Sequence, residues 1–434
     1  MKLALISDTH FGDPDCRLAH YGDQATKSNP VIGSLYEQFR AATGQDNDFL
    51  IVLGDILDFS VCSYRESFDI ARAFFRQVQI DKIAQSVIYV PGNHDADIWH
   101  LYEYEVNVIR RIAAGKAAQD FRYSVPGLID GRQKVEGSRF RLHGIKSDGR
   151  FRHGYGGTFI DSVTVQAQPD GTLTGEPMNF ALAYPNLYLL TDSGSVLMTH
   201  GHYLEEYWSM LGEWAVEIAG KQLGISGPPT IKQLVELNFP FNQLACSGSG
   251  QAGALTDKIV LPLQRDARNR DSRQLEKYLD GVFRKIDQLI PGKYLIDEFV
   301  SDAMMKNLKR RVVEFARSVE PTRYNEKFVR EARVQERFKR YFNSCKAEIA
   351  ELFPPTLSQP QRLVFGHTHR PIPWDYKSQS KSPVFRTLDG HQVHYCNLGG
   401  WLQGSEIGPQ DAFCGAEVLT FDSDTQTIKS QSIR

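Results

Sequence analysis

The segment Ser86-Val-Ile-Tyr-Val-Pro-Gly-Asn-His-Asp95 decides the fold of this chain. It begins as an apolar run of strand length and ends in a glycine-containing turn with three adjacent polar residues, Asn93, His94 and Asp95. Open α/β sheets build their functional sites at the carboxyl ends of strands. The segment therefore predicts a buried strand that delivers polar side chains to a site.

Four other polar clusters follow apolar runs in the same way. They are Asp8-Thr-His10, Gly54-Asp-Ile-Leu-Asp58, His200-Gly-His202 and Gly366-His-Thr-His369. Short apolar runs are typical of strands that are covered on both faces, as in α/β folds. These runs lie at residues 3–6, 49–53, 87–90, 196–198, 363–365 and 393–395. Helix-compatible segments lie between some of them, at residues 29–42 and 68–83, so we expect an α/β fold.

The spacing within the clusters indicates metal binding. In an extended backbone, residues i and i+2 point to the same side, so Asp8 converges with His10, and His367 converges with His369. Carboxylate oxygen together with imidazole nitrogen suits Mn, Fe or Zn better than Ca or Mg. Two Asp, one Asn and at least four His exceed one tetrahedral site. They fit two divalent metal ions that share a bridging carboxylate.

Composition bounds the class of protein. The 434 residues are 41% apolar and 24% charged, as expected for a soluble globular protein with a sizeable core. The net charge of −2 gives no reason to expect binding to nucleic acid or to an acidic membrane. The six cysteines form no CxxC pair, no signal peptide is visible, and no apolar run approaches the ~20 residues of a membrane span. We therefore expect a cytoplasmic protein.

Two regions interrupt the strand-like runs. The first begins with an expected helix at about residues 98–114 and ends in an expected hairpin at residues 187–199. The second runs from about residue 203 to residue 355, and helical periodicity recurs in its second half. We therefore predict a catalytic domain of residues 1–202 and 356–434, with residues 203–355 as a large, mostly helical cap.

Charge is uneven along the chain. Residues 263–350 carry 21 Lys and Arg against 14 Asp and Glu, a net charge of +7, whereas the rest of the chain carries −9. One interpretation is that these charges are spread over solvated helix faces. The other is that they form a basic cap that attracts a phosphorylated substrate.

The five clusters, in this order, resemble the motifs of the calcineurin-like metallophosphoesterase superfamily. The motifs D-x-H, GD-x-x-D, GNHD, HGH and GHTH extend from Asp8 to His369. The resemblance implies a four-layer α/β/β/α sandwich and a site for two metals. It implies one metal held by Asp8, His10 and His369, and another held by Asn93, His200 and His367, with Asp55 as the bridge.

The resemblance also implies that His94 is an acid beside the metals. In such a site, a hydroxide that bridges the metals attacks phosphorus from the side opposite the leaving oxygen. His94 then donates a proton to that oxygen or stabilises its developing charge. Two roles stay open for Asp95. It accepts a hydrogen bond from the His94 ring and sets its tautomer, or it is the carboxylate that starts a helix.

Five further residues lie near the implied ligands. Asp58 is expected to support a ligand or to cap the local turn, and it is not expected to bind metal itself. His202 is expected to lie behind the ligands or to contact substrate, because the first histidine of such a pair is the ligand in the family. Arg370 either bonds a phosphate bidentately or pairs elsewhere. Trp99 and His100 either line the pocket or form the first turn of a packed helix.

Details of the motifs favour some branches of the superfamily over others. The segment Gly54-Asp-Ile-Leu-Asp-Phe-Ser60 and the GNHD motif differ from the GDxVDRG and GNHE of phosphoprotein phosphatases. The segments Gly366-His-Thr-His-Arg-Pro371 and Asn397-Leu-Gly-Gly-Trp401 are similar to bacterial enzymes of the UDP-2,3-diacylglucosamine pyrophosphatase type. We therefore expect a metal-dependent phosphoesterase, with manganese as one candidate metal. Its expected substrate is a diester or a pyrophosphate of a small-molecule or nucleotide type.

Two alternatives stay open. A nuclease of the same superfamily would use the basic residues 263–350 to hold nucleic acid, although the chain shows no basic-aromatic motif of a known nucleic-acid module. A non-catalytic scaffold would lack ligands or His94, whereas every one of these positions is filled.

Overall fold

The structure, a computed structural model, describes residues 1–133, 178–205, 229–246, 328–352, 359–375, 384–403 and 415–434, and isolated residues between these ranges. The chain divides into two compact units. The first contains Met1–Gln251 and Val329–Arg434, and the second contains Ala252–Phe328. All the elements described below belong to the first unit.

Six strands form the first sheet, in the order β10-β5-β4-β1-β16-β17. Four neighbouring strands are parallel, and they are β1 (Lys2–Ile6), β4 (Asn47–Leu53), β5 (Ala84–Val90) and β10 (Asn179–Leu182). Two antiparallel pairings add β16 (Ala416–Asp422) beside β1, and β17 (Thr427–Ile433) beside β16. The strands predicted at residues 3–6, 49–53 and 87–90 are confirmed.

Seven strands form the second sheet, in the order β14-β15-β13-β12-β11-β6-β7. They are β6 (Gly127–Asp130), β7 (Leu142–His143), β11 (Asn186–Thr191), β12 (Gly194–Thr199), β13 (Arg362–Phe365), β14 (Val384–Arg386) and β15 (Gln392–Asn397). The hairpin predicted at residues 187–199 is confirmed as β11 and β12, which pair antiparallel. Two short pairs stand apart, β2 (Ala19–Asp23) with β3 (Ser28–Ile32) and β8 (Gln166–Ala167) with β9 (Leu173–Thr174).

The apolar core lies between the two sheets. Leu3 and Leu5 of β1 belong to the same buried cluster as Leu189 of β11 and Met198 of β12. The intervening Ala4 is just as buried but points to the opposite side of the sheet. Both faces of β1 are therefore covered, which explains why the run is apolar without alternation. Burial of each large side chain contributes about 1.5–3 kcal/mol to stability.

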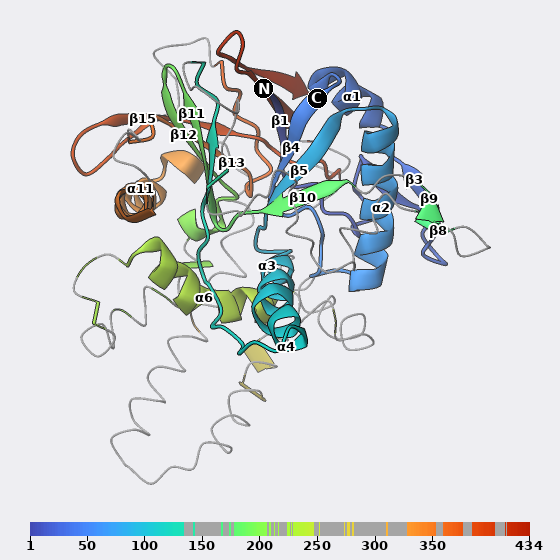
Figure 1. The fold of residues 1–434 in the computed structure, drawn as a ribbon, viewed down its shortest axis with the longest axis horizontal. Helices are drawn as coiled ribbons and strands as arrows, with labels where there is room; N and C mark the ends of the chain where they lie inside the picture. The colour runs from blue at the N-terminus through green and yellow to red at the C-terminus, as the bar shows by residue number, and fades with distance from the viewer. Residues whose placement is uncertain are drawn as a thin grey trace. The chain divides into compact units, whose positions relative to one another are not determined.

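Helices cover the outer faces of both sheets (Figure 1). α1 (Tyr36–Thr43) and α2 (Tyr64–Ile80) lie beside the first sheet, and α11 (Ala332–Leu352) lies beside the second. The order of layers is helix, sheet, sheet, helix, so the predicted α/β sandwich is confirmed. Within the described part of the chain, no helix is both long and apolar enough to cross a membrane.

Two predicted helix starts are wrong. Residues 28–32 form the edge strand β3, which accommodates Pro30, so the helix predicted at residues 29–42 begins only at Tyr36. The helix predicted at residues 68–83 begins at Tyr64, because Ser63 and Glu66 form a capping box there. The helix expected at residues 98–114 is present as α3 (Asp97–Tyr104), a π-helical turn (Glu105–Ile109) and α4 (Arg110–Ala113).

Helix α11 packs closely on the second sheet. The ring of Phe338 stacks on those of Phe385 and Tyr395, with centroids 5.2 and 5.5 Å apart. At the other end of the helix, Asn186 of β11 donates a 2.9 Å hydrogen bond to Glu348. α11 lies within residues 203–355, together with α6 (Ile231–Ala245). Much of residues 252–327 lies outside the described residues, so a helical cap at residues 203–355 stays a prediction.

Replacing Phe338 with Ala should lower the free energy of unfolding of the sandwich by about 3–5 kcal/mol, because a buried ring is lost and a cavity remains. Urea unfolding followed by tryptophan fluorescence measures the change. Leu388→Ala, at a side chain that is 57% exposed, is the control and should change it by less than about 0.5 kcal/mol. Equal unfolding free energies for the two variants would show that α11 is not an integral layer.

Candidate metal centre

The turns that follow β1, β4, β5, β12 and β13 meet at one edge of the sandwich. Backbone hydrogen bonds join the turn after β1 to the turn after β4, from Asp8 N to Gly54 O at 3.0 Å and from His10 N to Asp55 O at 2.9 Å. Another joins the turns after β12 and β13, from Gly366 N to the His200 carbonyl at 2.9 Å. All five predicted clusters are therefore brought together by the fold.

Five of the seven predicted ligands lie in left-handed backbone. Their φ angles are 53° for Asp8, 51° for His10, 50° for Asp55, 67° for His367 and 53° for His369. This conformation is uncommon outside glycine, costs about 1–3 kcal/mol per residue and clusters at functional sites. The extended geometry assumed from the D-x-H and H-x-H spacing is therefore wrong. The side chains converge because each turn reverses sharply.

Two glycines of the motifs make room for neighbouring ligands. A Cβ atom at Gly54 would overlap the ring of His200, and a Cβ atom at Gly92 would overlap Oδ1 of Asp55. The GD and GNH motifs thus need glycine because the predicted ligand side chains His200 and Asp55 press against the backbone there.

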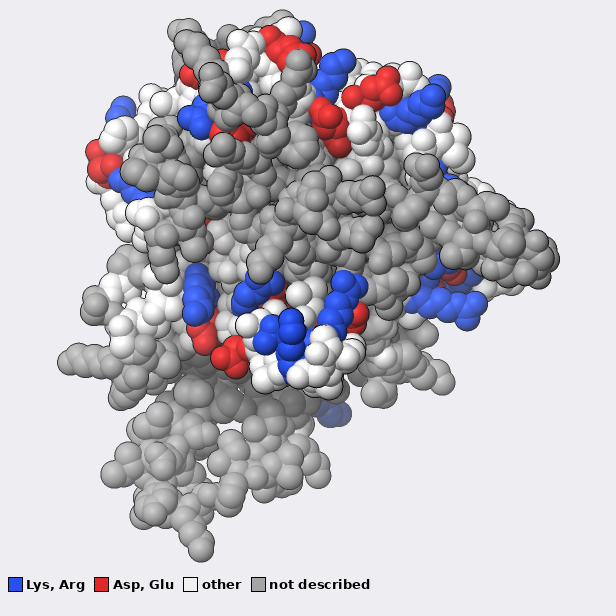
Figure 2. All heavy atoms as spheres, in the orientation of Figure 1, with Lys and Arg blue, Asp and Glu red and all other residues white. Residues whose placement is uncertain are grey.

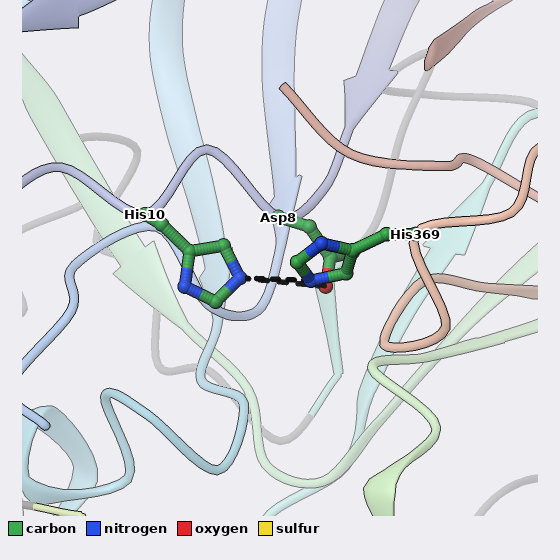
Figure 3. Close-up of side chains that lie close together, drawn as sticks. All are labelled: Asp8, His10 and His369. Carbon is green, nitrogen blue, oxygen red and sulfur yellow. Dashed lines mark hydrogen bonds and ion pairs between the residues drawn. The ribbon is translucent and has the colours of Figure 1, made fainter. Parts of the chain in front are cut away.

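The first group of candidate ligand side chains consists of Asp8, His10 and His369 (Figure 3). The Nε2 atoms of His10 and His369 point at each other, 3.0 Å apart, and Nε2 of His369 lies 3.3 Å from Oδ1 of Asp8. All three side chains are at most 3% exposed. Two nitrogens and a carboxylate oxygen therefore face one small buried space, which suits a cation.

The second group surrounds His200. Nε2 of this ring lies 3.1 Å from Oδ1 of Asn93 and 3.1 Å from Oδ2 of Asp55. On its other side, Nδ1 lies 3.0 Å from the carbonyl oxygen of Leu53 and can only donate to it. In the neutral ring, the carbonyl thereby fixes the tautomer and leaves Nε2 as the lone-pair nitrogen that faces the site.

Asp55 lies where the two groups meet. It forms one set with His10 and His94 and another with His200 and His367, with ligand atoms within 4.8 Å of one another in each set. Its Oδ2 atom is buried and accepts no hydrogen bond from the described residues. A buried carboxylate oxygen with unused acceptor capacity is expensive unless a cation neutralises it. The donor set of this site therefore fits a divalent metal.

The electrostatics of the site keep its carboxylates ionised, as metal ligands must be. Burial alone would raise the pKa of Asp8, but the hydrogen bond to His369 and the charge of His200 outweigh it and lower the pKa. Burial is opposed in the same way at Asp55, where His200 and His94 hold the pKa well below its usual range. Burial lowers the pKa of His200, but Asp55 more than reverses this and raises it to about 9.

Asp58 supports two histidines at once. Its Oδ2 lies 2.8 Å from Nδ1 of His10, and its Oδ1 lies 2.9 Å from Nδ1 of His94. It also accepts a 3.0 Å hydrogen bond from the backbone N–H of Ser60, as a local cap does. Asp58 therefore caps the local turn as expected, and its support of a metal ligand stays a prediction. The carboxylate turns each ring so that Nε2 points away from Asp58.

The role predicted for Asp95 at His94 is wrong, because Asp58 and Ser60 hold the His94 ring through Nδ1. Asp95 instead accepts hydrogen bonds from Gly92 N at 2.6 Å, from Ile56 N at 2.7 Å and from the Tyr89 hydroxyl. It does not start a helix either, because α3 begins at Asp97. The physical reason is that Asp95 is fully buried beneath its own turn, where its carboxylate ties the β4 and β5 turns together.

Glu205 was not predicted from the sequence. Its Oε2 lies 2.5 Å from Nε2 of His367, and both side chains are almost fully buried. The signal that could have found it is the spacing His200-Gly-His-Tyr-Leu-Glu205, which places an acidic residue one short turn after a ligand.

His202 and Arg370, the two residues predicted to lie behind the ligands or to contact substrate, have different surroundings. His202 is buried beside His200, with ring centroids 5.4 Å apart, and neither of its ring nitrogens has a hydrogen-bond partner among the described residues. Burial and the charge of His200 lower its pKa well below the usual value. The Arg370 backbone N–H bonds Thr368 Oγ1 at 3.4 Å. Contacts of His202 or Arg370 with substrate stay predictions.

Trp99 and His100 have separate roles. Trp99 is fully buried, and its indole N–H donates a 3.0 Å hydrogen bond to the Arg122 carbonyl. His100 lines a cavity of about 270 Å³. Phe121, Tyr123 and Phe239 line the same cavity. No candidate metal ligand lines this cavity, so a place for Trp99 or His100 in the substrate pocket stays a prediction.

Residues 1–208 match the family model of the calcineurin-like phosphoesterases. The chain therefore contains a calcineurin-like phosphoesterase domain, and the family model covers just under half of its length. The chain is accordingly a metal-dependent phosphoesterase, a hydrolase. No curated protein matches it, so the likeness to the UDP-2,3-diacylglucosamine pyrophosphatase type stays a prediction. The matched residues contain four of the five clusters, and the fold adds His367 and His369 from beyond them.

Replacing Asp58 with Asn should lower the activity of this phosphoesterase about 10–100-fold, because one of its two histidines loses its acceptor and its orientation. Initial rates with an activated phosphodiester in Mn²⁺ measure the effect. Asp130→Asn, at a buried carboxylate that pairs with Arg132, is the matched control. A rate in Asp58→Asn equal to that of the control would contradict the role given to Asp58.

Proposed function

We propose that this phosphoesterase hydrolyses a phosphodiester or a pyrophosphate with two divalent cations. The observation that carries the proposal is the shared position of Asp55, which belongs to two of the three side-chain sets with metal-binding distances. A carboxylate between two sets of imidazole ligands matches the arrangement that two-metal enzymes use for in-line displacement at phosphorus.

Seven side chains are the proposed metal ligands. Asp8, His10 and His369 hold one cation, Asn93, His200 and His367 hold the other, and Asp55 bridges them. The mixed oxygen and nitrogen ligands favour Mn, Fe or Zn. When bound, the two cations lower the pKa of water and offset negative charge on the phosphoryl oxygens.

His94 is the proposed proton donor to the leaving oxygen. Its side chain is 19% exposed, whereas that of its partner Asp58 is only 4% exposed, so His94 lies where a substrate can touch it. Asp58 and Ser60 hold its Nδ1 atom at 2.9 Å each. The Nε2 atom is then the one that meets the leaving oxygen, which requires a proton when the leaving group is a simple alcohol.

The substrate in this proposal is a small phosphorylated molecule with a ring or an apolar group. The motivation is the described cavity lined by His100, whose other walls include Phe121, Tyr123 and Phe239 and which contains no candidate metal ligand. Helix α3, which contributes His100, begins three residues after His94. Aromatic side chains with a few polar groups are the usual lining of small-molecule pockets.

Nucleic acid is the less favoured substrate. Three basic side chains of α11 pair with nearby carboxylates, since Lys339 and Arg340 contact Glu336, and Lys346 contacts Asp389. On the face drawn in Figure 2, described Lys and Arg side chains lie next to Asp and Glu rather than in a continuous stripe. Such mixed charges resemble a solvated surface more than a phosphate-binding track.

Replacing His94 with Ala should lower kcat about 10²–10⁴-fold for a diester with an alkyl alcohol as the leaving group, because the proton donor is lost. The loss should be much smaller for a 4-nitrophenyl diester, whose leaving group needs no proton. Steady-state kinetics with both substrates in Mn²⁺ measure the two ratios.

The control for this experiment is His391→Ala, at a histidine side chain that is 68% exposed, and its kcat should not change. Equal losses with both substrates in His94→Ala would rule out His94 as the acid. An enzyme that hydrolyses DNA faster than either small diester would favour the nuclease alternative.

Replacing Asp55 with Ala should reduce the bound metal from two cations per chain to one or none, because both proposed sites lose a ligand. Elemental analysis of the protein after gel filtration in Mn²⁺ measures this ratio. Asp48→Ala, at a side chain that is 36% exposed, should keep the value of the wild type. A wild-type protein with fewer than two cations would count against the two-metal proposal and favour the scaffold alternative.

A further inference from the structure

The turn that follows β12 carries a histidine, His200, and a glutamate, Glu205, toward the same site. Gly201 has a left-handed φ of 110°, and a single 3₁₀ turn (His202–Leu204) follows it. The turn is closed by hydrogen bonds from Leu204 N to Gly201 O at 2.9 Å and from Glu205 N to His202 O at 3.0 Å. One short turn therefore sets the positions of both His200 and Glu205.

This turn packs against the end of β13. A Cβ atom at Gly201 would lie 3.0 Å from the ring of Phe365, the last residue of that strand. Phe365 is followed by Gly366 and then by His367. The close approach at Gly201 thus brings the turn after β12 alongside His367.

Glu205 and His367 make a direct, buried contact. The two atoms, Oε2 of Glu205 and Nε2 of His367, lie 2.5 Å apart, and the side chains are 3% and 1% exposed. An ionised carboxylate can only accept a hydrogen bond. In a neutral His367 ring, the nitrogen that faces Glu205, Nε2, must therefore carry the hydrogen. The contact therefore selects one tautomer of the His367 ring.

The orientation of His367 is opposite to that of the other rings. Asp58 holds His10 through Nδ1, and the Leu53 carbonyl holds His200 through Nδ1, so both present Nε2 to the site. Glu205 holds His367 through Nε2, which leaves Nδ1 as its lone-pair nitrogen. A ligand histidine that bonds a carboxylate through its second nitrogen is a common way to fix its ring and raise its basicity.

We infer that Glu205 is a positioning residue that fixes His367 with its hydrogen on Nε2 and so presents Nδ1 to the second cation. The inference rests on the proposed function, because it takes His367 as a ligand of that cation. Glu205 itself touches neither substrate nor reacting atoms in this role.

The tautomer of His367 can be measured on the full chain before any metal is added. Long-range ¹H–¹⁵N correlation of ¹⁵N-histidine-labelled protein identifies the protonated nitrogen, and a His367→Gln spectrum assigns the signal. We expect hydrogen on Nε2 in the wild type and a mixture of both tautomers in Glu205→Ala. Glu205→Gln should keep the wild-type pattern, because its amide oxygen still accepts the hydrogen bond.

Metal affinity provides the second measurement. In Mn²⁺ titrations by calorimetry, Glu205→Ala should weaken one of the two binding steps about 10–100-fold and leave the other unchanged. Glu205→Gln should restore most of this loss. Glu417→Gln, at a buried glutamate that pairs with Arg434, is the matched control and should behave as the wild type.

The outcomes separate this inference from the proposed function. A wild type that binds fewer than two Mn²⁺ ions overturns the two-metal proposal itself. A wild type that binds two, with Glu205→Ala unchanged in tautomer and affinity, overturns the role of Glu205 alone. Loss of affinity in both Glu205 variants with an unchanged tautomer also overturns it, because Glu205 would then be a direct ligand.

Discussion

The rest of the structure depends on the burial of three carboxylates at one edge of the sandwich. Asp8, Asp55 and Asp58 are almost fully buried, and an isolated buried carboxylate costs several kcal/mol. Each one therefore gathers N–H groups from other turns. His367 N donates to both oxygens of Asp8 at 3.0 Å, and His94 N donates to Asp55 at 2.8 Å. The charges that suit a metal are thus the same charges that hold the turns together.

The need of the buried carboxylates for hydrogen bonds from other turns also explains why these turns stay in a strained conformation. A left-handed residue other than glycine costs about 1–3 kcal/mol, and Asp8 and His10 are two of them, separated by one residue. Hydrogen bonds from neighbouring turns hold them, from Trp401 N to the Asp8 carbonyl at 3.0 Å and from His10 N to the Asp55 carbonyl at 2.9 Å. The site is therefore shaped in advance, so a cation needs little rearrangement to bind.

The sequence predicts where the clusters lie better than it predicts the direction of each side chain. The strands could be predicted because a strand that is buried on both faces consists of consecutive apolar residues. The partner of His94 was missed because adjacency favoured Asp95, whereas the actual partner, Asp58, comes from a neighbouring turn 36 residues away. Glu205 was missed because it lies 162 residues from His367, and only the pairing of β12 with β13 brings them together.

The same pairing explains why α11 could not be assigned from sequence. β12 and β13 are parallel neighbours. Such strands need a crossover that returns the chain to the end of the sheet at which β12 begins, usually through a helix. α11 is the last described helix before β13 and packs on that sheet, so it serves as the crossover. Helical periodicity alone does not separate a crossover from a cap. The crossover leaves the sheet at the end of β12, in the turn that also holds Glu205 against His367.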